Sequence, residues 1–384
     1  MSAGFVPPPY PYDRLREVID MARGRFGEAV DLSIGTPCDP PPAVVLDALA
    51  HSGTERGYPP SVGTGAYREA AAGWISRRFG VDVPTDAVAA CVGTKELVAG
   101  LPHWLRLRRP DRDTVLYPAV SYPSYAMGAT LAGARAVAVR CDERWSIDLD
   151  AIDPADAARA ICLWVNSPGN PAGGLDDLVA AAEWGRRHGV LVLSDECYAE
   201  FTWDGPPHTI LEAGLDGVLA VHSLSKRSNL AGARAGIYAG DGDLVGYLSE
   251  VRKHAGLMVP GPVQAAAVAA WGDDEHVEVQ RGRYRRRLDR LAEGLAAIVP
   301  RVDLPRGGFY LWVEAPGGDA WGLTLRLARD AGIVASPGEF YGDVARGYVR
   351  LAVVRSDADI ELATERLIAL DAGVEAGIDV EIDR

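Results

Sequence analysis

Short apolar runs alternate with helix-length amphipathic segments over most of the chain, from Val44 to about Ala270. A run that is apolar at every position suits a strand buried on both faces, and the amphipathic segments suit crossovers between parallel strands. The expected strands are 114–117, 136–139, 161–165, 190–193, 219–222 and 236–239. The pattern predicts an α/β protein with a mostly parallel sheet, whose strands present their carboxyl ends to the ligand.

The chain has 384 residues, which exceeds the size at which a single core usually divides into domains. After an arginine-rich helical segment, about 274–298, the pattern changes to strand, helix, strand in the runs GGFYLWV, WGLTLRLARDAG and YVRLAVV. We therefore expect an N-terminal arm with part of a small domain in 1–40, a large domain in 41–275 and a small α+β domain in 276–384. The proline-rich arm extends to Tyr12 and precedes a helix of about 13–25.

The net charge of −14 would repel nucleic-acid phosphates and anionic lipids, so we expect neither as a partner. We find no apolar run long enough to span a membrane and no signal-peptide order at the N-terminus, and we expect a cytoplasmic protein. The five cysteines are scattered and form no CxxC pair. They predict reduced thiols in or near the core and no metal site.

Lys226 lies in HSLSKRSNLAGARAG, just after an expected strand and eight positions before Arg234. An amine attacks a carbonyl only when it is unprotonated, so a catalytic lysine needs burial or a neighbouring cation to lower its pKa. The small-residue loop and Arg234 would supply both. Taken alone, a lysine in this position is more often a solvated loop residue.

Asp195 ends an apolar strand in SDECYAEF, where a buried carboxylate requires a positive partner. A protonated pyridine nitrogen would be one, whereas a helix cap is the simpler alternative. Tyr198 either serves the same site or packs in the core. Asn166 and Asn170 in NSPGNPAGG form, by themselves, only a turn.

Two further segments contain candidate binding residues. Gly93, Thr94 and Lys95 in VGTKE open a helix, whose free N–H groups and dipole favour a phosphate. Arg350 lies within the apolar run YVRLAVV, where its guanidinium suits either a substrate carboxylate or an internal acid.

These motifs occur in one order along nearly the whole chain: LSIGTPCDPPP, GYPPSVGTGAYRE, VGTKE, YPSY, NSPGNPAGG, SDECYAEF, SLSKRSNLAGARAG, GGFYLW and YVRLAVV. In this order the chain resembles the class I/II aminotransferases of fold type I. The resemblance implies a pyridoxal 5'-phosphate (PLP) transferase fold, with a mostly parallel sheet in a large domain and a smaller α+β domain. It also implies an enzyme that uses an amino donor and a keto-acid acceptor.

The resemblance assigns the site residues by position, with Lys226, Asp195 and Tyr198 as the catalytic residues. Lys226 would hold PLP as a Schiff base and, once released, move the substrate α-proton. The phosphate would bind Gly93, Thr94, Lys95, Ser223, Ser225 and Arg234. The ring would contact Tyr122, Asn170, Asp195 and Tyr198, with Asp195 on the ring nitrogen. The substrate α-carboxylate would bind Arg350, Asn170 and the backbone near Gly35.

The resemblance further implies a homodimer with shared active sites, in which Tyr58 reaches the phosphate of the neighbouring subunit. The chain departs from the commonest family pattern in two places. NPAGG replaces NPTG, and KHAGLMVPG lacks the arginine that aspartate-specific members use for a second carboxylate. The second departure argues against simple aspartate specificity.

Long segments, including ERGYPPS, GTKELVAGLP, RKHAGLMVPGPVQ and SPGEFYG, look most like actinobacterial succinyldiaminopimelate aminotransferases of lysine biosynthesis. We therefore expect N-succinyl-2-amino-6-oxopimelate as the acceptor and glutamate as the donor. Lys253, His254 and Arg56 are candidates for the distal end of that substrate. The alternatives are a broad aspartate, alanine or aromatic aminotransferase, a PLP-dependent C–S lyase, and a non-catalytic binding module.

Overall fold

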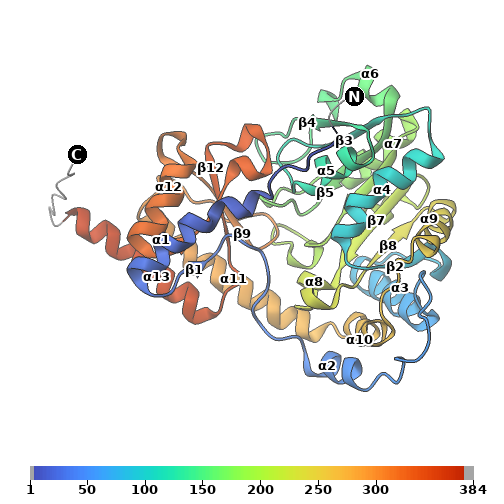
Figure 1. Cartoon of the computed structure of the whole chain (residues 1–384), viewed down its shortest axis with the longest axis horizontal. Coiled ribbons are helices and arrows are strands. Elements are labelled where there is room, and N and C mark those ends of the chain that lie inside the picture. The colour runs from blue at the N-terminus through green and yellow to red at the C-terminus, as the bar shows by residue number, and fades with distance from the viewer. Residues whose placement is uncertain (1–3, 376–384) are drawn as a thin grey trace. The chain divides into compact units, whose positions relative to one another are not determined.

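A seven-stranded sheet forms the centre of the larger part of the protein (Figure 1). The structure, a computed structural model, describes residues 4–375. The strand order is β2 (Val88–Cys91), β8 (Gly236–Gly240), β7 (Val218–Ser223), β6 (Leu191–Asp195), β5 (Ala160–Asn166), β3 (Thr114–Pro118) and β4 (Arg135–Val139). Among these strands only β8 is reversed, because it pairs antiparallel with both β2 and β7 while the other pairings are parallel. The predicted α/β class with a mostly parallel sheet is confirmed.

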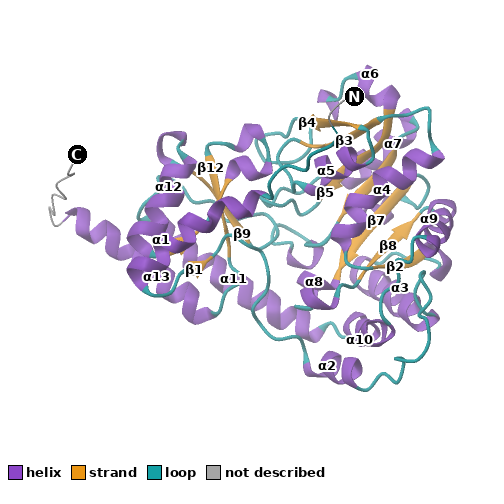
Figure 2. Cartoon of the chain, in the orientation of Figure 1, coloured by secondary structure: helices purple, strands orange, loops and turns teal. Residues whose placement is uncertain are grey.

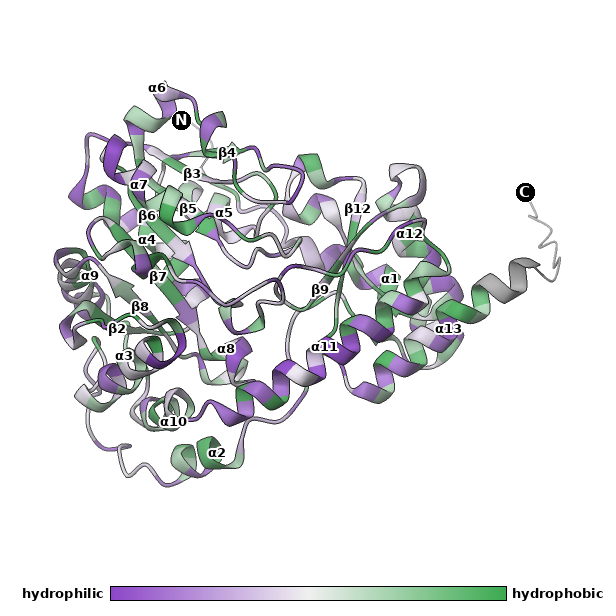
Figure 3. Ribbon diagram, turned by 180° about the vertical axis from the view of Figure 1, so that it is seen from behind, coloured by the Kyte–Doolittle hydropathy of each residue, from purple (hydrophilic) through white to green (hydrophobic). Residues whose placement is uncertain are grey.

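Helices cover both faces of this sheet, as the purple and orange elements of Figure 2 show. One apolar core includes residues of α2 (Ala43–Ala50), α3 (Gly65–Phe79), α7 (Leu178–His188) and α10 (Gly261–Gly272). The core on the other face includes residues of α4 (Thr94–Arg108), α5 (Ser124–Leu131) and α9 (Gly242–His254). All seven residues of β5 are buried, and the strands of the sheet are mostly green in Figure 3. Burial on both faces explains why β5 is apolar up to its last residue, Asn166.

All six strands expected from the sequence lie in this sheet, each displaced by no more than two residues at either end. The sequence reading missed β2, whose four residues are Val, Ala, Ala and Cys. Alanine and cysteine have little strand preference, so their position beside β8 defines this strand better than their composition does.

Local sequence sets the ends of the crossover helix α7. The Asp177 side chain accepts a hydrogen bond from the backbone N–H of Ala180 at 2.9 Å, which satisfies a free donor of the first turn. The helix ends at Gly189, whose φ of 61° is easy for glycine alone. Two further helices, α6 (Pro154–Arg159) and α8 (Leu224–Arg227), are short.

The chain divides into two compact units. The sheet belongs to the unit formed by Thr36–Arg285 and Pro305–Phe309, and the other unit comprises Met1–Gly35, Arg286–Leu304 and Tyr310–Arg384 as far as these segments are described. The division falls within the long helix α11 (Glu275–Ala296), which is largely purple in Figure 3 in keeping with its many arginines.

The second unit has two small sheets. In one, β12 (Tyr348–Ala352) pairs antiparallel with β9 (Tyr310–Glu314) and β11 (Ser336–Pro337). In the other, β1 (Val30–Asp31) pairs parallel with β10 (Ile333–Val334). The unit also contains α1 (Arg16–Phe26), α12 (Ala320–Arg326), a π-helical turn (Leu327–Ala331) and α13 (Asp357–Glu375). The expected N-terminal helix of 13–25 consists of a 3-10 turn, Pro11–Leu15, followed by α1.

We predict that Leu163→Ala will lower the free energy of unfolding by about 2–5 kcal/mol, because it leaves a cavity at the centre of the sheet. Leu163 is fully buried in the core that α3, α7 and α10 cover. Chemical denaturation of the purified protein measures the change. Leu107→Ala is the matched control, since Leu107 is 63% exposed and should change the stability by no more than about 0.5 kcal/mol. Equal losses for the two variants would contradict the assignment of the core.

Candidate active site

Polar residues gather where the strands of the large sheet end. Asn166 ends β5 opposite Asp195, which ends β6. Ser223 ends β7 opposite Gly236, which in turn lies opposite Cys91 at the end of β2. Because these four strands run in one direction, their carboxyl ends lie along one edge of the sheet. This edge of an α/β sheet is where ligands bind.

Gly93 and Arg234 approach each other so closely that no side chain fits at position 93. A Cβ atom there would lie 2.1 Å from Arg234 Nη2, and the φ of Gly93, +72°, also favours glycine. Arg234 itself has a left-handed backbone with φ of 59°, a conformation that costs a non-glycine residue energy and often marks a functional site. Its guanidinium donates to the carbonyl of Ala231 at 2.7 Å and to Ser225 Oγ at 3.5 Å.

The hydroxyl residues of the Lys226 motif are buried beside this arginine. Ser223 is 4% and Ser225 8% exposed, and Ser223 Oγ accepts the N–H of Ser225 at 3.1 Å. Thr94 is the first residue of α4, after Gly93, and its side chain lies against Gly236 of β8. The arrangement joins a guanidinium, hydroxyl groups and free N–H groups at a helix N-terminus, a combination that suits a phosphate.

Asp195 is buried at the end of β6, with 8% of its surface exposed. One carboxylate oxygen accepts the Tyr125 hydroxyl at 2.9 Å and the other accepts the N–H of Cys197 at 3.2 Å. Burial raises the pKa of this carboxyl, although the hydrogen bonds from Cys197 and Tyr125 oppose the rise. A positive group placed near Asp195 would therefore stabilise its charged form. The contact with Cys197 is a local turn and not the helix cap considered as the alternative, because the next helical turn, Ala199–Phe201, has Tyr198 at its N-cap and no side-chain cap.

Asn166 connects this edge to the loop that contains Asn170. Its side-chain amide donates to the carbonyl of Asp195 at 2.8 Å, and its side-chain oxygen accepts the N–H of Asn170 at 2.9 Å. Its own N–H donates to Asp176 at 3.0 Å. Asn170 is 6% exposed. The turn predicted for NSPGNP is thus fixed against the strand that ends in Asp195.

Aromatic rings lie beside the candidate lysines. Lys226 Nζ is 5.9 Å from the centroid of Phe309, and the ring of Tyr198 packs edge-on against the same Phe309 at 5.2 Å between centroids. Lys95 Nζ is 5.7 Å from the ring centroid of Tyr122. The motif GGF therefore contributes an aromatic residue to the unit that contains Lys226, a contribution that the sequence reading did not identify.

Two other supporting residues were also missed. Tyr125 is the second tyrosine of SYPSY and is fully buried, and its distance along the chain from Asp195 gives no sequence signal for their hydrogen bond. Arg252 is fully buried and donates to both carboxylate oxygens of Glu96, at 2.6 and 3.1 Å. Glu96 also accepts the N–H of Val92 at 2.9 Å. This pair fixes the chain on both sides of Gly93.

Arg350 and Gly35 come together in the other unit. The Arg350 guanidinium lies 4.2 Å from the ring centroid of Tyr310, and a Cβ at Gly35 would lie 2.2 Å from the Tyr310 hydroxyl oxygen. Arg350 is 2% exposed and donates to the carbonyl of Ser33 at 2.5 Å and to the Tyr12 hydroxyl at 3.2 Å. A guanidinium can also bind a carboxylate through two parallel hydrogen bonds.

The remaining sequence candidates lie on the surface. Tyr58 is 97% exposed in the segment between α2 and α3. Arg56, Lys253 and His254 are also exposed, and Lys253 lies 3.6 Å from Glu250 on the same helix. Cys38 is exposed, so the expectation of a core or near-core position was wrong for this cysteine, which lies in the loop before α2.

The fold and this sheet edge define a fold-type I aminotransferase. A family model for aminotransferases of classes I and II matches residues 28–367. The chain belongs to this family and is a transaminase. Aminotransferases of this family use PLP, and they transfer an amino group from a donor to a keto acid.

Known relatives match nearly the full length. The chain is 43% identical to a 4-dedimethylamino-4-oxo-anhydrotetracycline transaminase of Streptomyces rimosus over 94% of this chain and 99% of the relative. It is 34% identical to an LL-diaminopimelate aminotransferase of Desulforudis audaxviator over 94% and 95%. It is 30% identical to a probable N-succinyldiaminopimelate aminotransferase of Thermus thermophilus, whose solved structure matches with a TM-score of 0.85 over 93% and 99%.

Within the described part of the chain, no helix is both long and apolar enough to cross a membrane. A search of the same residues for groups of histidine, cysteine, aspartate and glutamate that could hold a metal ion found none.

Asp176 should make stability depend on pH. Burial raises its pKa from 3.8 to about 6, against the hydrogen bonds from the N–H groups of Ile147 and Asn166. Since the folded state holds this proton to higher pH than the unfolded state, the unfolded state binds fewer protons between about pH 4 and pH 6. The free energy of unfolding should therefore fall as pH rises through this range, by at most about 3 kcal/mol from this group.

Asp176→Asn isolates this effect because asparagine does not titrate. Chemical denaturation of both proteins at several values between pH 4 and pH 7 measures the difference in their free energies of unfolding. We expect the wild type to lose stability relative to the variant up to about pH 6, with no further change above it. A difference that stays constant over the whole range would contradict the raised pKa.

Proposed function

We propose that Lys226 binds PLP and that Asp195, Arg234 and their neighbours hold the cofactor for amino transfer. The observation that carries the proposal is that two features occur at one edge of the sheet. One is the space beside Arg234 that Gly93 leaves open because it has no side chain, and the other is the buried carboxylate of Asp195. The first suits an anion and the second suits a cation. PLP has both, as a phosphate and a protonated ring nitrogen.

The donor groups of this edge fit the phosphate. A Cβ at Gly93 would collide with Arg234, so glycine leaves the helix N-terminus open beside the guanidinium. Thr94, Lys95, Ser223 and Ser225 would add hydroxyl and ammonium donors. The ring would then lie near Asp195, with Tyr122 on its face and Asn170 and Tyr198 at its hydroxyl oxygen.

When bound, PLP supplies an electron-withdrawing ring that stabilises negative charge at the substrate α-carbon. Lys226 Nζ would take the proton from that carbon and deliver it to the C4' carbon of the cofactor, which is general base and then general acid catalysis by one group. Asp195 keeps a proton on the ring nitrogen, and its buried position strengthens this interaction. Tyr125 and Cys197 hold the Asp195 carboxylate in place through their hydrogen bonds.

Arg350 would bind the substrate α-carboxylate, with Asn170 and the backbone near Gly35. A guanidinium binds a carboxylate in two parallel hydrogen bonds, which fixes the plane of the substrate. Tyr58, exposed in one chain, would reach the phosphate of a neighbouring subunit in a homodimer. We further propose that the enzyme is cytoplasmic.

For the substrate we propose N-succinyl-2-amino-6-oxopimelate, aminated with glutamate as the donor in diaminopimelate and lysine biosynthesis. The similarity to the probable N-succinyldiaminopimelate aminotransferase of Thermus thermophilus and to the LL-diaminopimelate aminotransferase supports a long dicarboxylate. Lys253, His254 and Arg56 are cationic or titratable groups for its distal end. The absence of an arginine from KHAGLMVPG argues against a substrate as short as aspartate.

A second candidate substrate is a ketone on a polycyclic carbon skeleton. The observation that favours it is the 43% identity to the 4-dedimethylamino-4-oxo-anhydrotetracycline transaminase, which exceeds the identity to the LL-diaminopimelate aminotransferase. Both candidates need the same lysine and the same cofactor cradle. They differ in the far end of the substrate, which is anionic in one and a neutral or phenolic ring system in the other.

Lys226→Ala should abolish the visible absorbance band of the cofactor bound covalently to this lysine. It should also lower the transaminase rate at least about a thousandfold, because the base that moves the α-proton is lost. Absorbance spectroscopy and single-turnover assays measure both effects. Arg301→Ala is the control, since this arginine is exposed, pairs with Asp303 and belongs to none of the proposed binding groups, so it should leave the spectrum and the rate unchanged. A variant without Lys226 that turns over at the wild-type rate would disprove its role.

The substrate prediction uses the wild-type enzyme and its cofactor spectrum. Addition of glutamate, and separately of N-succinyl-diaminopimelate, should convert the cofactor to its amino form, whereas aspartate and alanine should convert it much more slowly. Conversion by small amino acids alone would leave the aminotransferase proposal intact and refute the succinyl substrate. Release of pyruvate from cysteine or cystathionine without an acceptor would instead identify a C–S lyase.

A further inference from the structure

A buried arginine, Arg227, directly follows the candidate catalytic lysine, and all of its N–H groups form hydrogen bonds. Arg227 is the last residue of α8, a helix of four residues, and is 2% exposed. A buried guanidinium is rare because its charge must be compensated. So short a helix cannot hold its own position, since helices of one turn are unstable without tertiary contacts. The contacts of Arg227 are therefore central to where Lys226 lies.

Arg227 uses all five of its N–H groups. Nε donates to Glu200 at 3.0 Å, and Nη1 donates to Ser228 Oγ at 3.2 Å and to the carbonyl of Ala270 at 2.6 Å. Nη2 donates to the carbonyl of Asp273 at 3.2 Å and to the Asp274 carboxylate at 2.9 Å. An arginine has five such donors in a rigid plane, so this set fixes both the position and the orientation of the side chain.

Aromatic rings complete the surroundings of this arginine. The guanidinium carbon of Arg227 lies 5.4 Å from the ring centroid of Trp74 and 5.3 Å from that of Trp271. Both rings are buried in the core beneath the sheet. Attraction of a desolvated cation to aromatic faces adds to the hydrogen bonds and also limits the positions that another side chain could take.

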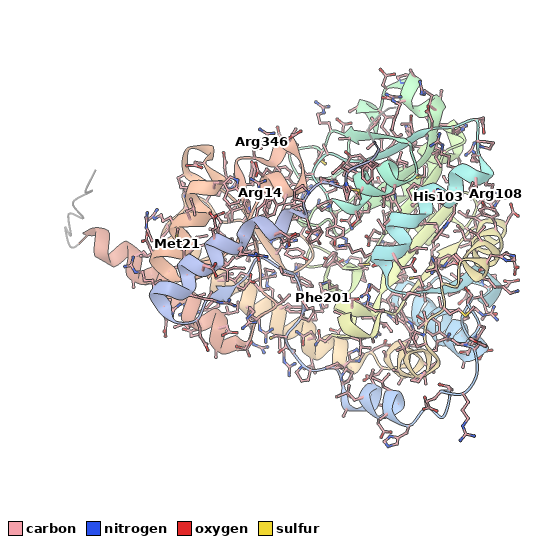
Figure 4. The ribbon with its side chains drawn as sticks, viewed as in Figure 1. Arg14, Met21, His103, Arg108, Phe201 and Arg346 are labelled. Atoms are coloured by element: carbon pink, nitrogen blue, oxygen red, sulfur yellow. The ribbon has the colours of Figure 1, made fainter. Side chains whose placement is uncertain are left out.

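Glu200 connects this arginine to the segment that contains Tyr198. Glu200 lies in the 3-10 turn Ala199–Phe201 and is 5% exposed. Besides Arg227, its carboxylate accepts the indole N–H of Trp74 at 2.8 Å and lies 2.6 Å from Nε of Arg78. Phe201, the next residue, is labelled in Figure 4. Glu200 is thus held from three sides, two residues after Tyr198.

The two segments that Glu200 and Arg227 join each contribute one side chain to the same aromatic ring. Tyr198 packs on Phe309 at 5.2 Å between centroids, and Lys226 Nζ is 5.9 Å from that ring. The Glu200–Arg227 ion pair joins these two segments, with 3.0 Å between Arg227 Nε and the Glu200 carboxylate. A shift of either partner would change the distance between the Lys226 amine and the Tyr198 hydroxyl.

We propose that Glu200 and Arg227 are positioning residues that set the geometry of Lys226 relative to Tyr198. This inference rests on the proposed role of Lys226 as the PLP-binding base and extends it to two residues that touch neither substrate nor cofactor. A catalytic base must be held within a fraction of an ångström of its productive position, because small misplacements strongly reduce the rate. The planar, five-donor guanidinium provides such a constraint, whereas a flexible lysine ammonium does not.

Arg227→Lys keeps the charge but loses the planar fork, and Glu200→Gln keeps an acceptor for Trp74 but loses the charge. In the PLP-loaded protein we expect each variant to lower kcat about tenfold while KM changes by less than about twofold, since binding groups are untouched. We also expect the pH midpoint of the visible cofactor band, which reports the environment of the Lys226 nitrogen, to move by about half a pH unit or more.

Arg287→Lys is the matched control. Arg287 is also a buried arginine, 3% exposed, and pairs with Asp357 in the other unit. Its substitution should lower thermal stability to a similar degree without moving the band midpoint. If either Arg227→Lys or Glu200→Gln fails to fold, as judged by near-ultraviolet circular dichroism, the other variant still tests the positioning role. An unchanged band midpoint and an unchanged kcat in a folded variant would overturn the positioning role alone. A wild-type protein that shows no visible cofactor band would instead overturn the proposed function on which this inference rests.

Discussion

Burial of the central strands on both faces is the constraint on which the rest of the larger unit depends. Strands such as β5 have no face on which a polar side chain can reach water, so polar residues occur only where the strands end. Because β2, β5, β6 and β7 run in one direction, these ends form a single edge. Asn166, Asp195 and Ser223 are there for this reason, and the local turns that follow add Gly93 and Arg234.

The two buried carboxylates of Glu200 and Asp195 differ in the charge of the groups that bind them. Glu200 lies against Arg227, Arg78 and the Trp74 indole, so its charge is compensated within the protein. Asp195 is bound by a tyrosine hydroxyl and a backbone N–H, which are neutral donors. Burial accordingly raises the pKa of Asp195. A carboxylate with only neutral donors is ready for a cationic ligand, whereas a fully paired one has a supporting role.

The sequence predicted those parts of the structure that depend on short-range pattern. The strands β3 and β5 to β8 were recognisable because burial makes them largely apolar, and the edge strand β4 was recognisable from its short apolar run although most of it is exposed. Thr94 was recognisable as a helix start because Gly precedes it. The missed features are the ones that depend on distant partners. Glu96 and Arg252 are separated by 156 positions, and Tyr125 and Asp195 by 70. Nothing local distinguishes an arginine that pairs at such a distance from a solvated one, and β2 is defined by its neighbour β8 more than by its own residues.

The same reasoning explains why the family is easier to recognise than the substrate. The residues proposed to hold the cofactor, Gly93, Arg234 and Asp195, would serve a group that all members share, so their motifs carry little information about what is aminated. Specificity must come from residues that face the far end of the substrate, and these need no fixed backbone geometry. Lys253, His254 and Arg56, the residues proposed for that far end, are exposed side chains outside the cofactor motifs. The likeness both to a 4-dedimethylamino-4-oxo-anhydrotetracycline transaminase and to an LL-diaminopimelate aminotransferase is therefore consistent with a common cofactor site and a substrate region that varies between relatives.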